Sequence, residues 1–173
     1  MGKIKQVLFL CSGNTSRSPA AEYLAKYLKE TKYKDELKEV SFDSAGLYSY
    51  YKTPREGTAN YLKSKGINFD EFVGKQIDED LVKKQDLILG FEERWHKRKF
   101  SRKFKNLPDL DEKTYLLLEY AEEEGNFEIL DPINFTPEEY REVLKKIEKG
   151  VDQVLKKIIR INNSYEDDMA EKN

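Results

Sequence analysis

Short apolar runs alternate with amphipathic stretches along this chain. Three runs are continuous, at residues 7–10 (VLFL), 86–91 (DLILGF) and 113–118 (KTYLLL), and residues 39–46 (EVSFDSAG) alternate between apolar and polar side chains. Continuous apolar runs bounded by turn signals are typical of buried parallel strands, and alternation is typical of a strand with one exposed face. The pattern therefore predicts four strands.

Helical periodicity fills the intervals between these strands. Helices are predicted from Pro19, with an apolar face, and over residues 55–66, 78–85, 92–104 and from about 136 to 161. Thr136 provides an N-cap for the last helix and Glu139 the matching carboxylate three residues later. Alternating strands and helices predict an α/β fold: residues 1–161 form a single domain with a four-stranded parallel sheet and helices on both faces, in three layers. The polar, acidic tail, residues 162–173, is predicted to be disordered.

Composition narrows the class of protein. Charged residues make up 37% of 173 positions, yet the formal net charge is only −2, so we expect neither a nucleic-acid partner nor a membrane partner. The abundance of Lys and Glu favours a heat-adapted protein. A single cysteine excludes an intramolecular disulfide and a thiolate-rich metal site, and the first apolar run is too short for a signal peptide. We expect a cytoplasmic monomer.

The segment CSGNTSRSP, residues 11–19, carries the strongest chemical signal. It joins the carboxyl end of the first strand to the start of a helix, where ligands bind in open parallel sheets and where free N–H groups favour an anion. Gly13 and Asn14 allow the backbone to curve into a cradle, and Arg17 is suited to grip a tetrahedral oxyanion. The segment is not a Walker A loop, because no Gly-Lys-Ser/Thr ends it.

Cys11 lies at the base of this cradle. N–H groups, a helix N-terminus and an arginine favour a thiolate, and a thiolate facing a bound phosphoryl group is a nucleophile. Ser18 is placed to donate a hydrogen bond to it. A buried, inert cysteine is the usual meaning of such a residue, but it leaves Gly13, Asn14 and Arg17 unexplained.

The whole segment resembles the signature of the low-molecular-weight protein tyrosine phosphatase family, C-x-G-N-x-x-R-S-P. DSAG at residues 43–46 and LDPINF at residues 130–135 also resemble parts of that family. The resemblance implies Cys11 as nucleophile, Arg17 as phosphate ligand and Asp131 as general acid. It also implies a phosphorylated protein or peptide as substrate, inorganic phosphate as product, and no metal or other cofactor. The implied phosphate-binding loop comprises Ser12, Gly13, Asn14, Thr15, Ser16 and Ser18.

The resemblance further implies that Asn14 and Ser44 hold the loop in shape. The family often adds a histidine to that network, but the aligned position here is Phe72. The only histidine, His96, lies in a basic segment and is expected to be a solvated surface residue. Ser16 replaces a second cysteine found in many members, so the protective disulfide cannot form and Cys11 is expected to over-oxidise. A single cysteine also argues against arsenate reduction.

Substrate choice stays open between phosphotyrosine and phosphoarginine. Thr15 takes the place of a bulky aliphatic residue in tyrosine-specific members, and it resembles the protein arginine phosphatase branch. Tyr48, Tyr50 and Tyr51 follow the second strand, where the family places an aromatic wall. Such rings stack on a phenyl group or on a planar guanidinium.

Two alternative functions remain open. A phosphopeptide-binding module without turnover needs the cradle but neither Cys11 nor Asp131. A nucleic-acid interface rests on the basic segment, residues 94–105. There the pattern places Phe91, Trp95 and Phe104 toward the core and leaves the cations in solvent, which is the usual meaning of such a run.

Overall fold

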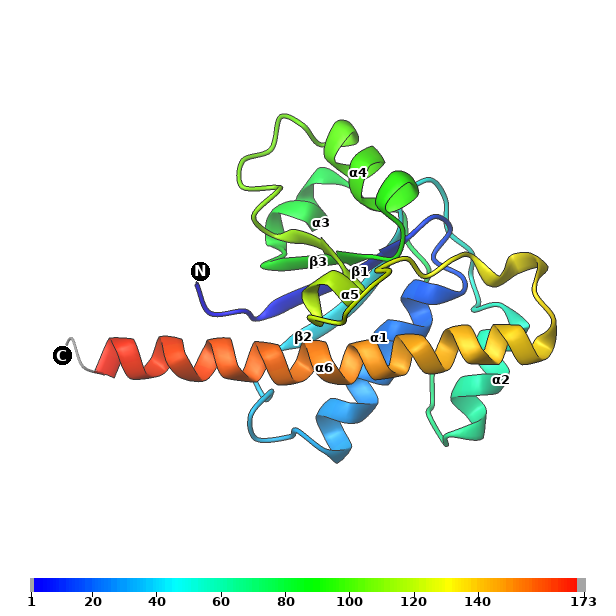
Figure 1. The fold of residues 1–173 in the computed structure, drawn as a ribbon, viewed down its shortest axis with the longest axis horizontal. Helices are drawn as coiled ribbons and strands as arrows, with labels where there is room; N and C mark the ends of the chain where they lie inside the picture. Colours follow the sequence, from blue (N-terminus) through cyan, green and yellow to red (C-terminus); the bar gives the residue numbers. More distant parts are fainter. Residues whose placement is uncertain (1, 171–173) are drawn as a thin grey trace.

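The computed structural model describes residues 2–170, which form one parallel sheet between two helical layers (Figure 1). The strands are β1 (Gln6–Cys11), β2 (Ser41–Gly46), β3 (Leu87–Gly90) and β4 (Thr114–Leu116). They lie in the order β2-β1-β3-β4, and every neighbouring pair is parallel. The predicted three-layer α/β fold with four strands is therefore confirmed.

Helices cover both faces of the sheet. They are α1 (Arg17–Thr31), α2 (Glu56–Ser64), α3 (Glu79–Lys84), the π-helix η1 (Glu93–Lys97), α4 (Arg98–Lys103), α5 (Leu117–Tyr120), the 3-10 helix η2 (Pro132–Asn134) and α6 (Pro137–Ala170). Figure 1 shows α3 and α4 on one side of the sheet and α1 and α6 on the other. The predicted single helix over residues 92–104 is thus two elements, η1 and α4.

Alternate side chains of β1 point into two separate cores, because successive residues of a strand face opposite sides of the sheet. Val7 and Phe9 pack in the larger core, with side chains from α1, α5 and α6. Leu8 and Leu10 pack in the smaller one, with side chains from α3 and α4. All four strand residues are at most 1% exposed, so β1 is held from both sides and its end is fixed in position.

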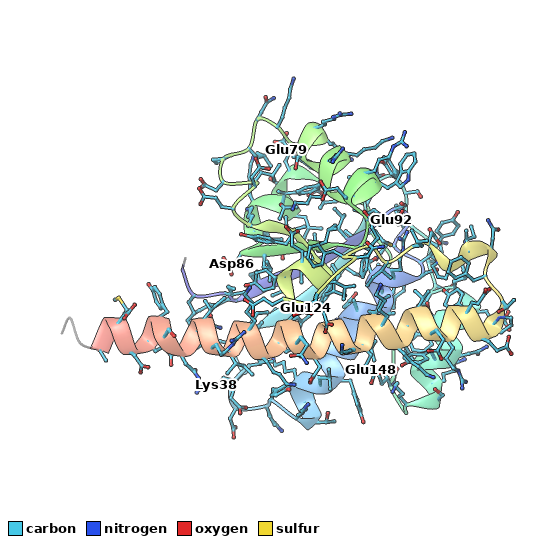
Figure 2. The ribbon with its side chains drawn as sticks, viewed as in Figure 1. Lys38, Glu79, Asp86, Glu92, Glu124 and Glu148 are labelled. Atoms are coloured by element: carbon cyan, nitrogen blue, oxygen red, sulfur yellow. The ribbon has the colours of Figure 1, made fainter. Side chains whose placement is uncertain are left out.

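The carboxyl ends of β1, β2 and β3 meet at one edge of the sheet. Cys11, the last residue of β1, is paired in register with Gly46, the last residue of β2. Figure 2 shows Glu92 beyond the carboxyl end of β3, at the opposite end of that strand from Asp86. Segments that follow these strands are therefore brought together.

The C-terminal segment differs from its prediction. Helix α6 continues to Ala170, so residues 162–170 are helical rather than disordered, and residues 171–173 lie outside the described part of the chain. Asn162 is 4% exposed; its Oδ1 accepts from the Ile4 N–H at 2.7 Å, and its Nδ2 donates to the Ile4 carbonyl at 2.9 Å. These bonds tie the helix to the segment before β1. Among the described residues no helix combines the length and apolarity needed to cross a membrane.

Candidate active site

The segment between β1 and α1 forms a buried loop around the thiol. Cys11 is 3% exposed and Arg17 is 1% exposed. Ser16 occupies the N-cap position of α1, but its side chain makes no capping hydrogen bond. The first N–H groups of a helix need partners, and those of α1 follow directly after the loop. The anion-binding role of this backbone stays a prediction.

Asn14 shapes this loop. Its φ angle of 48° lies in the left-handed region, which asparagine tolerates better than most residues. Its Oδ1 accepts from the Lys75 N–H at 2.9 Å, so Nδ2 must face the other way. Nδ2 donates to Ser44 Oγ at 2.8 Å and to Ser18 Oγ at 3.0 Å. The side chain therefore connects the loop, β2 and α1.

This network favours Ser18 as the donor in its hydrogen bond with the Cys11 sulfur. Ser18 Oγ lies 3.0 Å from Cys11 Sγ. Because Ser18 Oγ already accepts a hydrogen bond from Asn14, its own hydrogen is free to point at the sulfur. A hydroxyl that donates to sulfur favours the thiolate over the thiol. The structure thus arranges the hydrogen bonds as a nucleophilic cysteine requires.

Glu22 ends the same network, and sequence reasoning missed it. Ser44 Oγ donates to Glu22 Oε2, and Lys26 donates to the other carboxylate oxygen. Burial raises the pKa of Glu22, while its bonds to Lys26 and Ser44 lower it in part. Phe72 stays outside the network and packs against the Tyr23 ring, with centroids 6.2 Å apart. The sequence did contain a signal for Glu22: it follows Ser18 by four residues, which places both side chains on the same face of the predicted helix.

Arg17 is held by groups from two later segments. Its Nη1 donates to Glu92 and, at 2.8 Å, to the Ile129 carbonyl, and its Nη2 donates to Asp131 Oδ2 at 3.0 Å. Nε is buried and has no hydrogen-bond partner among the described residues. Nε and Nη2 share the edge of the guanidinium that binds an oxyanion side-on. Glu92 and Ile129 therefore leave that edge for an anion.

Glu92 is the second residue that sequence reasoning missed. It follows β3 directly and is 9% exposed. A buried carboxylate paired with a buried guanidinium fixes the side chain of Arg17 and balances its charge. Its position just beyond a parallel strand was the signal, because such positions converge on the ligand-binding edge of the sheet.

Asp131 lies within reach of the loop through Arg17. Its other oxygen, Oδ1, accepts from the Ile133 N–H at 3.1 Å, which caps η2. The side chain is 44% exposed, so it lies at the mouth of the site rather than at its base. The structure thus brings the predicted nucleophile, phosphate ligand and acid into one cluster.

His96 is buried, so the expectation of a surface histidine is wrong. Its side chain is 0% exposed, because the π-helix η1 turns the ring back under the loop. The N–H groups of Phe91 and Glu92 both donate to Nδ1 at 3.1 Å. Nδ1 therefore carries no proton, and Nε2 donates to Ser12 Oγ at 3.2 Å. Burial, followed by the nearby charge of Arg17, holds the pKa of His96 well below its usual range.

The buried neutral His96 is expected to weaken the fold in acid. The unfolded chain takes up a proton near pH 6.5, whereas the folded protein takes it up only at a much lower pH. The free energy of unfolding should therefore fall as pH decreases below 6.5, by at most about 1.4 kcal/mol per pH unit. Urea unfolding at pH 7 and pH 5 measures this loss.

The matched comparison is His96→Gln, which keeps a side-chain donor and acceptor but does not titrate. This variant should lose less stability between pH 7 and pH 5 than the unchanged protein. Glu22 acts with the opposite sign, since its raised pKa favours folding at lower pH, and it cancels in the comparison. An imidazole resonance that titrates near 6.5 in the folded protein contradicts the prediction.

The expected substrate wall is only partly assembled around the loop. A Cβ on Gly13 would lie 3.4 Å from the Tyr51 ring, so this ring covers the loop. The Tyr48 N–H donates to the Ser12 carbonyl at 3.1 Å, which sets Tyr48 beside it. Tyr50 is 53% exposed, and its side chain makes no hydrogen bond or ring contact within residues 2–170. Thr15 is half-buried at the loop.

Two further corrections concern the basic segment and Ser16. Trp95, expected in the core, is 42% exposed, whereas Phe91 and Phe104 are buried as expected. The π-helix is the reason, since its wider turn places His96 rather than Trp95 toward the sheet. Ser16 is 3% exposed, and its Oγ has no hydrogen-bond partner within residues 2–170.

Comparisons with known proteins agree with this geometry. The family model for low molecular weight phosphotyrosine protein phosphatase matches residues 6–164. The low molecular weight protein-tyrosine-phosphatase YfkJ of Bacillus subtilis is 30% identical over 155 residues, which cover 88% of this chain and 94% of the relative. A protein-arginine-phosphatase of the same organism is 28% identical over 155 residues, covering 88% and 95%.

Solved structures show the same fold. The crystal structure of YfkJ from Bacillus subtilis has a TM-score of 0.75 at 27% identity, covering 92% of this chain and 97% of that one. A variant of the YwlE arginine phosphatase with a phosphorylated active-site serine has a TM-score of 0.77 at 26% identity, covering 88% and 95%. The match over residues 6–164, which includes the loop, the cysteine and the arginine, shows that the chain belongs to the low-molecular-weight phosphotyrosine protein phosphatase family and so to the cysteine-dependent protein phosphatases.

Proposed function

We propose that this protein removes phosphoryl groups from protein side chains, with Cys11 as nucleophile, Arg17 as phosphate ligand and Asp131 as general acid and base. One observation carries the proposal: the sulfur of the only cysteine lies 3.0 Å from Ser18 Oγ, which Asn14 holds in place, at a helix N-terminus that also holds Arg17. A buried structural cysteine has no need of such an arrangement. The substrate is a phosphorylated protein or peptide, and the product is inorganic phosphate.

The first step transfers the phosphoryl group to sulfur. The Cys11 thiolate attacks phosphorus in line, and the bond from phosphorus to the leaving oxygen or nitrogen breaks. Asp131 gives its proton to that leaving atom. The loop N–H groups and the Nε–Nη2 edge of Arg17 hold the equatorial oxygens, where charge develops. Because Asp131 is bound to Nη2, the entering phosphoryl group competes for this nitrogen and releases the carboxyl group toward the leaving atom.

The second step regenerates the enzyme. Asp131, now a carboxylate, takes a proton from water, and the oxygen of that water attacks phosphorus. The sulfur–phosphorus bond breaks, the thiolate of Cys11 re-forms, and phosphate leaves. The bonds from Glu92 and Ile129 keep Arg17 in place through both steps.

Phosphoarginine is the substrate that we propose. Thr15 is half-buried in the loop, and we infer that its hydroxyl bonds to a phosphoguanidinium. Asp131 adds a carboxylate at the mouth that suits a cationic leaving group. One relative of similar length is named a protein-arginine-phosphatase, which supports this choice.

Phosphotyrosine is the second candidate, and the aromatic wall favours it. Tyr51 covers the loop at Gly13, and a phenyl ring is able to stack against it. A relative named as a protein-tyrosine-phosphatase is slightly closer in sequence, at 30% identity.

Thr15→Ile is expected to reverse the preference between these substrates. The bulky aliphatic side chain removes the hydroxyl and suits a phenyl ring better, so kcat/KM should fall for a phosphoarginine peptide by about tenfold and hold or rise for the phosphotyrosine peptide of the same sequence. Thr15→Val separates the two effects, since it removes only the hydroxyl at similar size. An unchanged ratio in both variants shows that Thr15 does not select the substrate.

Turnover itself is tested with p-nitrophenyl phosphate, which needs only the loop, the nucleophile and the acid. Steady release of p-nitrophenol supports the phosphatase function. Phosphate binding without release of p-nitrophenol supports the alternative, a phosphopeptide-binding module. Cytoplasmic location, a monomeric state and the absence of a cofactor stay predictions.

A further inference from the structure

Helix α4 and η1 expose cations that have no carboxylate partner. Lys97 and Arg98 are paired, with Glu119 and Glu93 respectively. Lys99, Arg102 and Lys103 are not within salt-bridge distance of any acidic side chain in residues 2–170. Lys103 instead donates to the Leu47 carbonyl at 3.2 Å. Lys99, Arg102 and Lys103 therefore form a local group of uncompensated positive charge on one short helix, which suits an anionic partner.

These three cations line a hollow together with the loop that follows β2. The hollow is open to solvent and has a volume of about 330 Å³; it is lined by Leu47, Tyr48, Lys99, Arg102 and Lys103, and we call it the α4 groove. Leu47 forms its buried floor and Tyr48 an exposed side. The hollow is large enough to admit a side chain that carries an anionic group.

The α4 groove is directly connected to the phosphate loop. Tyr48 donates its N–H to the Ser12 carbonyl at 3.1 Å, and its ring forms the wall of the groove. On the other side, His96 donates to Ser12 Oγ, and its neighbour Trp95 accepts a bond from the Tyr48 hydroxyl at its carbonyl, at 3.3 Å. A peptide held over the loop therefore passes next to the groove.

Lys99 is positioned in advance for an anion. Its Nζ lies 4.4 Å from the centroid of the Trp95 ring and 5.7 Å from that of Tyr48. Cation–π contacts restrict the long side chain and so reduce the entropy lost on binding, while they leave the charge uncompensated. Arg94 stacks on Trp95, at 5.0 Å, and extends the basic surface.

We propose that the α4 groove binds an anionic group of the substrate, close to the phosphorylated residue, and so selects acidic sites. This inference rests on the proposed phosphatase function and adds its sequence preference. The shared chemistry is a carboxylate or a second phosphoryl group within a few residues of the reacting one. A nucleic acid fits less well, because its charges repeat along a backbone and demand a longer basic track than one short helix.

The test compares peptides of one sequence that carry the phosphorylated residue. Three peptides are made, in which the residues on both sides of the phosphorylated residue are glutamate, glutamine or phosphoserine, respectively. The acidic peptides should exceed the glutamine peptide in kcat/KM by roughly threefold to tenfold at low ionic strength. The ratio should approach one near about 1 M salt, where charges are screened beyond about 3 Å. Comparing the glutamate peptide with the phosphoserine peptide shows whether the groove prefers a carboxylate or a phosphoryl group.

Lys99→Gln/Arg102→Gln should abolish this ratio. The matched control is Lys34→Gln/Lys38→Gln, which removes the same charge from exposed positions beyond the far end of α1, a 15-residue helix roughly 22 Å long. The control should retain the ratio, so a loss in both variants indicates only net charge and overturns the proposal. Figure 2 shows Lys38 on the opposite side of the molecule from Glu92.

Two outcomes separate this inference from the proposed function. If neither p-nitrophenyl phosphate nor any of the peptides is hydrolysed, the proposed phosphatase function itself is contradicted. If they are hydrolysed with equal kcat/KM for acidic and neutral flanks, the groove proposal alone is overturned. A labelled single-stranded RNA that binds at physiological salt and is released by Lys99→Gln/Arg102→Gln, without any peptide preference, assigns the α4 groove to nucleic acid instead.

Discussion

Cys11→Ser is expected to abolish phosphate-ester hydrolysis while leaving oxyanion binding in place. A serine hydroxyl is far less ionised than a thiol near neutral pH, and no general base contacts residue 11 to activate it; its partner, Ser18, donates. We expect kcat for p-nitrophenyl phosphate to fall by a factor of about 10⁴ or more. The loop N–H groups and Arg17 are unchanged, so inorganic phosphate should still bind, as calorimetry can measure.

Ser18→Ala provides the graded control. It keeps the nucleophile but removes the hydrogen bond to sulfur and breaks the connection to Asn14. We expect reduced turnover, because the attacking sulfur loses a hydrogen-bond donor and the loop loses a connection to Asn14. A Cys11→Ser enzyme with full activity would falsify the nucleophile assignment, and loss of phosphate binding in it would point to collapse of the loop.

Asp131→Ala is expected to lower kcat by about 10² to 10⁴, which is the usual contribution of a general acid. The effect should grow as the leaving group becomes poorer, because a phenolate or an arginine nitrogen needs the proton more than p-nitrophenolate does. A series of aryl phosphates of increasing phenol pKa measures this dependence. A steeper slope for the variant than for the unchanged enzyme identifies the acid role.

The structural contacts of Asp131 require a second variant. Its oxygens bond to Arg17 and to the Ile133 N–H, and alanine removes both contacts. Asp131→Asn keeps hydrogen-bonding capacity at this position but cannot donate a proton as a carboxylic acid does. If asparagine restores turnover, Asp131 positions Arg17 and is not the acid. Asp35→Ala, at an exposed turn after α1, is the control for loss of one surface carboxylate.

Local patterns in the sequence were sufficient for the fold and for the centre of the site. Three continuous apolar runs and one alternating segment identified the four strands, and a parallel sheet carries its ligands at the carboxyl strand ends, so Cys11 and Arg17 could be placed from the sequence. These inferences succeed because they depend on residues adjacent in the chain. The N-cap at Thr136 is of the same kind: its hydroxyl accepts from the Glu139 N–H at 3.2 Å.

Contacts between distant segments were outside the reach of such patterns. Glu92 pairs with Arg17 across 75 positions, and His96 supports Ser12 across 84. The position of Glu92 after a strand hints at the site but does not name its partner, and His96 carries no local signature. The prediction of a disordered tail was wrong for the same reason. Nothing in the local sequence distinguishes Asn162 from other polar residues near the C-terminus, and its bond to Ile4 forms only in the folded chain.

The sequence by itself determined that a thiol and an arginine share an anion-binding loop at the end of a buried strand, because chain-local geometry and hydrophobic burial dictate that arrangement. Only the tertiary structure decided which edge of Arg17 remains for the phosphoryl group, where the hydrogen of Ser18 points, and which cations stay unpaired beside Tyr48. These are properties of hydrogen bonds and charges that form only once segments far apart in the chain are packed together.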